Sequence, residues 1–212
     1  MPTNDAPSAL VDDFALLLLT EDGQFATRRS LDGLFAVALL IELAQLERLE
    51  LFGEDNRLFV TDDSDTGVPA LNEALAALEE HKGSVVKEAI ARLSTGQKDR
   101  VLGRLVAEGA VESRTERRKL IFSNTTWHLV DTARRNKIHA DIKAVLFGAE
   151  DPAEQDELIV GLLSAAALVK IVAGRSKTAK QIAEKVWERY PVAGVVIDLG
   201  VQGVPEGIIP PI

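Results

Sequence analysis

The stretch "LFAVALLIELAQLERLEL", residues 34–51, predicts the centre of the fold. The residues that recur mostly at helical spacing in it are Leu34, Val37, Ile41, Ala44 and Leu51. The positions between them are also apolar, namely Ala38, Leu39, Leu40 and Leu43. Because a helix that is apolar on nearly all sides is buried by other elements, we expect this one to lie at the centre of a helical bundle.

Short apolar segments on both sides of this stretch predict its neighbours. Before it, "FALLLLTEDGQF" ends in the turn signal Asp22-Gly23, and its four consecutive leucines are compatible with either a strand or a buried helix. At its end, "LELFGEDNRLFV" predicts a small hairpin. Further helices are predicted from Pro69, from a cap at Ser84, over residues 97–108, up to about Phe147, from Asp151, Pro152 and Glu154 to about Val172, and around Ile182, Val186 and Trp187.

The predicted elements indicate a mainly α fold: a compact, bundle-like single domain with a protruding β-hairpin at residues 111–127. A length of 212 residues with 46% hydrophobic composition fits one domain with its own core. We expect residues 1–11 to be a flexible N-terminus, residues 12–200 to form the domain, and residues 201–212, rich in Gly and Pro, to be an irregular tail.

Charge is distributed unevenly along the chain. The formal net charge is −9, yet residues 92–145 contain 12 basic and 6 acidic residues, an excess of +6. A basic segment inside an acidic chain is either a solvated face or a surface that attracts phosphate-bearing partners. There is no cysteine, which excludes disulfides and thiolate metal sites. We find no secretory leader and no apolar run of membrane-spanning length, so we expect a cytoplasmic location.

Motifs for catalysis are absent from the sequence. It contains no GxGxxG, no GxSxG, no HExxH and no Gly-rich loop ending in Gly-Lys-Ser or Gly-Lys-Thr. His81, His128 and His139 stand at no metal-ligand spacing with one another. We therefore expect no catalytic residue, no metal site and no cofactor, and a function in binding.

The basic segment permits a nucleic-acid interpretation. A helix, a Gly turn and an arginine-rich hairpin over residues 98–129 follow the local order of a winged helix, whose helix enters the major groove. Lys98, Arg100 and Arg104 are few for such a helix, and the acidic remainder of the chain would repel DNA. We keep a DNA-binding protein as an alternative and expect no nucleic-acid partner.

An ordered set of motifs resembles the Golgi phosphoprotein 3 family. These motifs are "LLLLTEDGQF", "LIELAQLERLEL", "DDSDTGVPALNEALAAL" and "RLVAEGAVE" running into "KLIFSNTTWHL". The resemblance extends from about Asp13 to near Val172, and the short N-terminus is similar to that of prokaryotic members. It implies a mainly helical fold with a protruding hairpin. It also implies a non-enzymatic, peripheral membrane adaptor that binds phosphatidylinositol 4-phosphate, self-associates and retains client membrane proteins.

The headgroup pocket that the resemblance implies is only partly present. The family tryptophan falls at Thr27, and the three family arginines fall at Ala36, Thr95 and Lys98, so only Lys98 keeps a charge. Nearby basic residues can compensate, because each exposed one contributes on the order of 1 kcal/mol near an anionic membrane. The predicted residues for an anionic, phosphoinositide-like headgroup are Lys98, Arg28, Arg29, Arg92 and Arg100.

The hairpin matches the family pattern better than the pocket does. The residues predicted for self-association into a homo-oligomer are Arg117, Arg118, Leu120, Ile121 and Phe122. Adjacent apolar residues of a strand point to opposite faces, so one face is left for a partner. A scaffold that binds only proteins is a further alternative, because three of the four pocket positions have lost their family residue.

Overall fold

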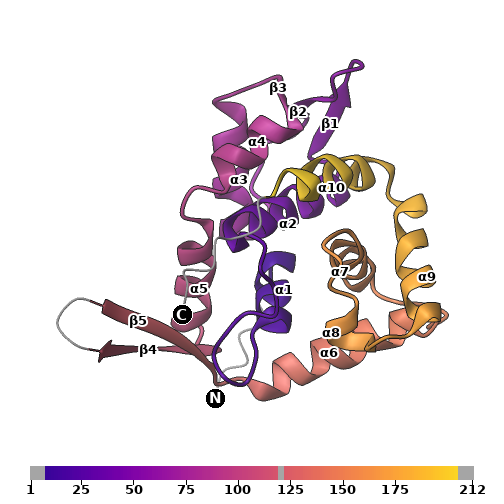
Figure 1. Ribbon diagram of the computed structural model, residues 1–212. Coiled ribbons are helices and arrows are strands. Elements are labelled where there is room, and N and C mark those ends of the chain that lie inside the picture. Colours follow the sequence, from indigo (N-terminus) through magenta and orange to yellow (C-terminus); the bar gives the residue numbers. More distant parts are fainter. Residues whose placement is uncertain (1–7, 119–121, 205–212) are drawn as a thin grey trace.

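The computed structural model describes residues 8–118 and 122–204 and shows a mainly α, single-domain protein (Figure 1). Helix α2, Leu31–Gln45, lies at its centre. This helix begins at Ser30, whose side-chain oxygen accepts a hydrogen bond from the Gly33 N–H at 3.4 Å. Residues 33–41 are all buried, and α1, α3, α4, α5, α7 and α10 pack around them. The prediction of a central helix is confirmed.

The end of α2 differs from the prediction. The helix stops at Gln45, and residues 49–51 belong to strand β1, Leu49–Phe52. Glu47 adopts a left-handed φ of 56°, and the Arg48 N–H returns to the Leu43 carbonyl at 2.9 Å. This left-handed residue reverses the chain although the residues on both sides are apolar. The predicted small hairpin is confirmed, since β1 pairs antiparallel with β2, Arg57–Val60, with Leu49 opposite Val60.

The four leucines before Asp22 belong to a helix and its end. Helix α1, Leu10–Leu18, is buried along nearly its whole length, and Leu19 pairs with Phe25 across the turn that contains Gly23. Gly23 has a φ of 77°, and a Cβ there would lie 2.9 Å from the Trp127 carbonyl oxygen. The turn therefore packs closely on the base of the long hairpin. Because α1 begins at the buried Leu10, residues 10 and 11 are not a flexible terminus; residues 1–7 lie outside the described residues.

The next segment forms three helices and a short strand. Helix α3, Pro69–Glu79, begins at Pro69 as predicted, and α5, Gln97–Ala107, matches the helix predicted for residues 97–108. Helix α4, Val86–Leu93, forms without the predicted cap. Ser84 instead lies in β3, Ser84–Val85, which pairs with β2, and its hydroxyl donates to the His81 carbonyl at 2.8 Å.

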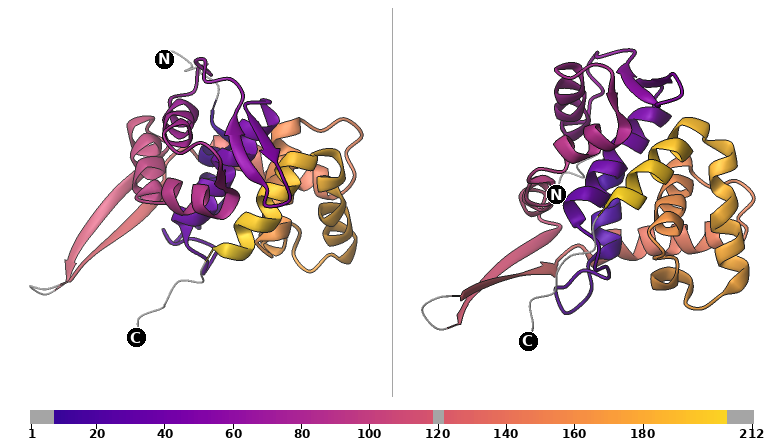
Figure 2. Two further views of the ribbon diagram at one scale, coloured as in Figure 1. Left: turned by 90° about the horizontal axis from the view of Figure 1, so that it is seen from above. Right: turned by 45° about the horizontal axis from the view of Figure 1, so that its top comes forward.

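A long antiparallel hairpin projects from the body in every view (Figures 1 and 2). Strand β4, Val111–Arg118, pairs with β5, Phe122–Leu129, from Val111 opposite Leu129 to Arg118 opposite Phe122. The predicted protruding hairpin is therefore confirmed. Leu120 and Ile121, two of the predicted association residues, lie outside the described residues.

The remaining helices form a second group beside α2 (Figure 1). They are α6, Thr132–Leu146, α7, Glu154–Ala165, α8, Lys170–Ala173, and α9, Lys177–Lys185, followed by the 3-10 turn η2, Val186–Arg189. The predicted long helix to Val172 is wrong, because Ala167 has a left-handed φ of 59° and separates α7 from α8. The predicted Asp151 cap is also wrong, since Ala153 precedes α7 and no side chain caps it.

The chain then returns to the centre in α10, Pro191–Gly203, a helix that the Gly-rich sequence did not predict. Residues 201–203, predicted to belong to the irregular tail, are the last three residues of α10. Residues 205–212 lie outside the described residues. A Cβ on Gly200 would lie 2.7 Å from Ile90 and 2.8 Å from Val37. Glycine therefore permits α10 to pack closely on α2 and α4.

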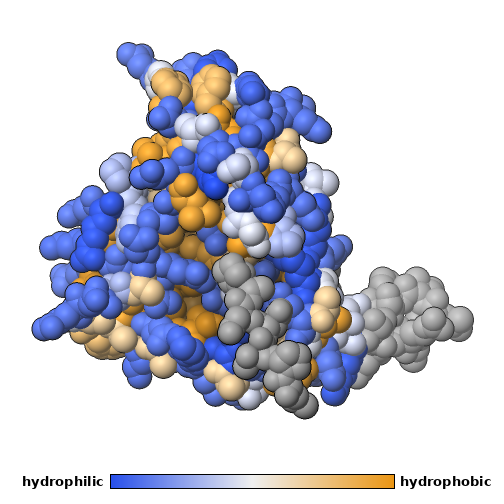
Figure 3. All heavy atoms as spheres, turned by 180° about the vertical axis from the view of Figure 1, so that it is seen from behind, coloured by the Kyte–Doolittle hydropathy of each residue, from blue (hydrophilic) through white to orange (hydrophobic). Residues whose placement is uncertain are grey.

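Surface composition is mixed. Seen from behind, polar and charged side chains cover most of the molecule, and apolar side chains gather in the hollowed middle of that face (Figure 3). Within residues 8–118 and 122–204, no helix combines the length and the apolar character that crossing a membrane requires.

Candidate anion-binding face

Two loops line an open hollow of about 420 Å³, which we call the loop hollow. One loop connects α1 to α2, and the other connects α7 to α8. The lining residues are Phe25, Ala26, Thr27, Arg28, Arg29, Ala166, Ala167, Leu168 and Lys170. Three of them are cationic and none is acidic, so the hollow favours an anion.

The three cations differ in how they are held. The side chains of Arg28 and Lys170 are exposed and make no hydrogen bond or ion pair within the described part of the chain. Arg29 is fixed, because its Nη1 donates to the Val201 carbonyl at 3.2 Å and to the Val204 carbonyl at 3.4 Å. A cation at the carboxyl end of a helix is favoured by the exposed carbonyl groups there. Arg29 therefore secures the end of α10, while Arg28 and Lys170 stay available for a ligand.

Lys98 lies beside this hollow but is not among its lining residues. Its backbone N–H donates to Asp32 Oδ1 at 2.8 Å, which places the start of α5 against the start of α2. Its Nζ lies 6.0 Å from the centre of the Phe25 ring, a cation-π distance. Phe25 thus separates Lys98 from the loop hollow.

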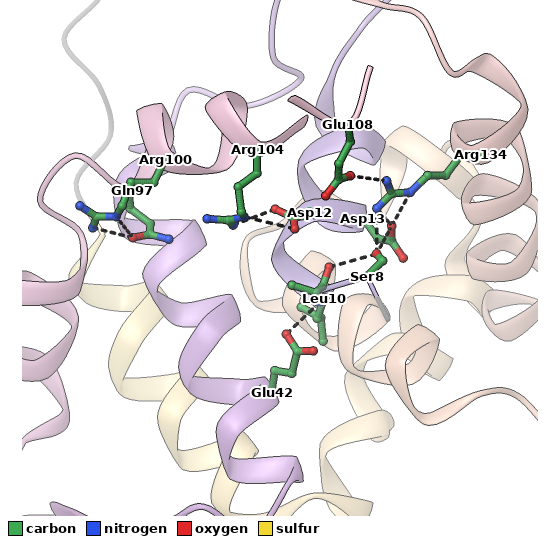
Figure 4. Close-up of polar contacts among 11 residues, drawn as sticks. Ser8, Leu10, Asp12, Asp13, Glu42, Gln97, Arg100, Arg104, Glu108 and Arg134 are labelled. Atoms are coloured by element: carbon green, nitrogen blue, oxygen red, sulfur yellow. Dashed lines mark hydrogen bonds and ion pairs between the residues drawn. The ribbon is translucent and has the colours of Figure 1, made fainter. Parts of the chain in front are cut away.

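Arg92 and Arg100 lie at a different place. They line a hollow of about 390 Å³ with residues of α3, including Glu73, and with Thr95 and Gln97. Arg100 donates to Gln97 Oε1 at 2.6 Å and to the Leu93 carbonyl at 3.2 Å, and Figure 4 shows this pair. Arg92 donates to the Ser84 hydroxyl at 2.6 Å. Both arginines are engaged within the chain, and Glu73 weakens the attraction of this hollow for an anion.

The five predicted headgroup residues therefore do not gather at one site. Arg28 and Arg29 share the loop hollow, Lys98 stands behind Phe25, and the other two line the second hollow. The family pocket positions are also separated, because Thr27 lines the loop hollow, Thr95 lines the second hollow and Ala36 is buried inside α2. Lys170 was missed by sequence reasoning. Its only signal is a single cation at the end of the apolar run "LIVGLLSAAALV".

A polar network fixes α5 and α6 to the start of α1 (Figure 4). Arg104 donates to Asp12 Oδ1 at 2.8 Å. Arg134 contacts Asp13 at 2.8 Å and Glu108 at 3.0 Å. Two further side chains bind Asp13: Gln155 Nε2 donates to its Oδ2 at 2.9 Å, and Ser8 Oγ donates to its Oδ1 at 2.8 Å. We call these residues, together with Glu42, the α1 network.

Burial raises the pKa of two carboxyl groups of the α1 network. It raises the pKa of Asp12, although the Arg104 guanidinium lowers it. Burial likewise raises the pKa of Glu42 to about 7, although its carboxylate accepts the Leu10 N–H at 2.9 Å. Because the paired carboxyl and guanidinium groups of this network join α1 to α5 and α6, we interpret the network as a structural clamp.

The network also bears on the winged-helix interpretation. The face of α5 that carries Val101, Leu102 and Leu105 is buried, and Arg104 is paired with the buried Asp12. Arg100 is engaged with Gln97. A recognition helix needs free side chains on an exposed face. Helix α5 is instead a packed helix of the core, which disfavours DNA binding through it.

Comparison with known proteins agrees with the fold. No curated protein matches the chain. A family model described as Golgi phosphoprotein 3 (GPP34) matches residues 10–199, from the first residue of α1 into α10. This match spans most of the chain and includes every described element up to the first part of α10. The chain therefore belongs to the Golgi phosphoprotein 3 (GPP34) family.

Proposed function

We propose that this protein is a non-catalytic adaptor that associates peripherally with membranes at the cytoplasmic side. It binds the phosphorylated headgroup of an anionic, phosphoinositide-like lipid in the loop hollow and self-associates through the β4–β5 hairpin. Membership in a lipid-binding adaptor family supports this proposal. The observation that carries it is the loop hollow, whose lining has three cations, two of them without a partner in the described chain, and no carboxylate.

The chemistry of the lining suits a phosphate ester. A guanidinium group offers two parallel N–H donors that match two phosphate oxygens, and an ammonium group adds a compact positive charge. Arg28 lies in the loop between α1 and α2, and Lys170 is the first residue of α8; their side chains are the two free donors. Arg29 contributes charge without moving, because it is held by α10. Arg92 and Arg100, expected from the sequence to join them, have no role in this proposal.

Vesicle flotation tests the lipid-binding part. The variant Arg28→Gln/Lys170→Gln is compared with Lys82→Gln/Lys87→Gln, which removes the same charge from the region around α3 and α4. We expect vesicles of phosphatidylcholine with phosphatidylinositol 4-phosphate to bind the wild type and the control pair. Binding of the loop-hollow variant should fall by on the order of tenfold or more, because two charge-assisted contacts are lost. Equal binding of all three proteins contradicts the proposal.

The hairpin supports the self-association part. In a two-stranded sheet each strand has one edge whose backbone groups are unpaired within the sheet. The base of the hairpin is covered, where the Trp127 N–H approaches the Gly23 carbonyl at 3.5 Å. A long projecting edge of this kind pairs readily with another strand. We propose a second copy of this chain as the partner, and client membrane proteins as further partners of the assembly.

Light scattering tests this part separately. We expect the wild type to have a mass above that of one 22.9 kDa chain. A variant in which a short Gly-Ser linker replaces residues 114–126 should be monomeric and keep its helical circular dichroism, since α1–α10 do not depend on the outer hairpin. A monomeric wild type contradicts self-association. Oligomers that bind no vesicle would instead identify a protein-only scaffold.

A further inference from the structure

A row of side chains on α6 is unused by the proposed headgroup site. Arg135, His139 and Lys143 recur every four residues, and Phe147 follows at the same interval just after the helix. Residues four apart are neighbours on one side of a helix. At about 1.5 Å per residue, the three cationic positions extend over about 12 Å. We call these four residues the α6 row.

Pairing divides the basic residues of α6 into two sets. Arg134 contacts Asp13 and Glu108, and Lys137 contacts Asp141 at 2.7 Å. In contrast, the side chains of Arg135, His139 and Lys143 make no hydrogen bond or ion pair within the described ranges. The Nε of Arg135 is buried without any partner.

Apart from Phe147, the row carries only basic side chains. Protonation of His139 would place like charges four residues apart on the helix, which is destabilising. Burial lowers the pKa of His139, and the positive charges of Arg135 and Lys143 lower it further. An anionic surface opposite the row would offset these positive charges. The row is therefore suited to an anionic partner.

The end of the row indicates which partner. Phe147 is 56% exposed, the most exposed of the large hydrophobic side chains in the described chain. A bilayer surface offers anionic phosphates to cationic side chains and a headgroup zone that accepts an exposed aromatic ring. An acidic peptide would need the charges but not the exposed ring. Helix α8, which begins at Lys170 of the loop hollow, packs against α6, so both features lie on neighbouring elements.

We infer that the α6 row is a second membrane-contact surface, separate from the headgroup site, which binds the general negative charge of a lipid bilayer and inserts Phe147 between headgroups. This inference rests on the proposed function only in requiring that the protein reaches a membrane. We expect the α6 row to show no preference for a particular headgroup, because single charges spaced along a helix do not select one lipid. The row strengthens attachment to any anionic bilayer, and the loop hollow supplies the preference for a phosphorylated headgroup.

Vesicles without phosphoinositide test the row alone. Vesicles of phosphatidylcholine with phosphatidylserine as one lipid in three are titrated with wild type, with Arg135→Gln/Lys143→Gln, and with the matched control Lys137→Gln/Lys180→Gln. The control removes two lysines that are paired with Asp141 and Glu184. We expect the row variant to bind about 25-fold more weakly, roughly fivefold per charge, and the control to stay within about twofold of wild type. Similar weakening of the variant and the control overturns the inference.

A fluorescent probe tests insertion of the ring. Because the chain has no cysteine, Phe147→Cys carries a single polarity-sensitive dye, and Glu54→Cys on the β1–β2 turn is the control. We expect a blue shift at position 147 on anionic vesicles and none at position 54. An unshifted probe at position 147 overturns the inference, as does binding to polyglutamate in place of vesicles. Failure of the Arg28→Gln/Lys170→Gln test on phosphoinositide vesicles would contradict the proposed function without changing either result here.

Discussion

The α1 network and the basic face, which comprises the loop hollow and the α6 row, are built from the same kinds of side chain but differ in their partners. Arg134 and Arg135 are adjacent in the sequence. Arg134 contacts two carboxylates of the α1 network, and Arg135 contacts none in the described chain. A paired arginine fixes helices to one another, while an unpaired one is left for a molecule outside the fold. The distinction depends on the helix side, which changes by about 100° between neighbouring residues.

The two regions also respond differently to solvent. Charges of the α1 network are partly or fully buried, so salt screens them weakly and removal of one leaves its partner without compensation. Arg28, Lys143 and Lys170 are exposed, so salt screens them strongly and their removal changes stability little. We therefore expect substitutions in the network to change unfolding, and substitutions on the basic face to change binding.

The largest expected effect is the loss of Arg104. Arg104→Met leaves the carboxylate of Asp12 buried without its ion pair, which destabilises by about 3–5 kcal/mol. Urea unfolding at neutral pH measures this change. The double variant Asp12→Leu/Arg104→Met should regain most of the lost stability, because no charge remains buried. A single variant that unfolds like the wild type would show that the network is not a clamp.

Comparison of the adjacent arginines tests the distinction directly. Arg134→Met should destabilise by about 2 kcal/mol, since Asp13 and Glu108 lose a shared partner. Arg135→Met should not lower the free energy of unfolding, because it removes no hydrogen bond or ion pair of the described chain and takes away a buried N–H without an acceptor. Thermal unfolding of both variants in one buffer is the measurement. Equal losses would remove the basis for treating the two arginines differently.

Titration of Glu42 gives the network a pH dependence. The pKa of Glu42 is raised from 4.5 to about 7 by burial, so the folded chain keeps a proton that the unfolded chain releases in this range. Its contribution to stability is therefore complete below pH 4.5 and is lost as the pH rises through 7. Glu42→Gln keeps the acceptor for the Leu10 N–H and carries no charge. We expect the variant to be more stable than wild type by on the order of 2 kcal/mol at alkaline pH, with the difference vanishing towards pH 4.5.

The measurement is urea unfolding of both proteins across that pH range. Vesicle binding is the control, because Glu42 is not part of the basic face and its substitution should leave binding unchanged at any one pH. A constant difference between the two proteins at every pH would mean that Glu42 does not titrate in this range. Such a result would leave Asp12, whose pKa is also raised by burial, as the titrating group of the network.

Sequence alone predicted those parts of the fold that depend on local pattern. The all-round apolar character of residues 34–43 identified the central helix, and two short apolar pieces around a turn identified the small hairpin. The long hairpin was identified from an arginine-rich run that follows a Gly turn and leads into a β-like run. The sequence could not predict the left-handed residues Glu47 and Ala167, which end helices inside apolar runs. Helix α10 was missed because Gly200 lowers helix propensity, and its reason, close packing on Val37, is a tertiary contact.

The candidate site was predictable only in part, for a related reason. Arg28 and Arg29 were identified because they are adjacent to a recognisable motif, whereas Arg92 and Arg100 were assigned to the same site from nearness in the sequence and lie in another hollow. Lys170 is 142 positions from Arg28 and meets it only through the packing of α7 and α8. Nor could the sequence show that Arg134 forms ion pairs and Arg135 does not, because the carboxylates that Arg134 contacts belong to other helices.

The smallest expected effect concerns Ala167, which lines the loop hollow in a left-handed conformation with a φ of 59°. This conformation destabilises a residue with a Cβ by about 1–2 kcal/mol, and glycine relieves it while losing part of the gain to its more flexible unfolded state. Ala167→Gly should therefore stabilise by about 0.5 kcal/mol in thermal unfolding, with Ala166→Gly, at a buried right-handed position, as a destabilising control.

Because Arg28 and Lys170 are unchanged in Ala167→Gly, its binding to phosphoinositide vesicles should be unaltered. A stabilised variant that binds less well would instead show that the strained turn shapes the loop hollow for its ligand. Stability and binding would then depend on the same residue, whereas in the α1 network the residues affect stability alone.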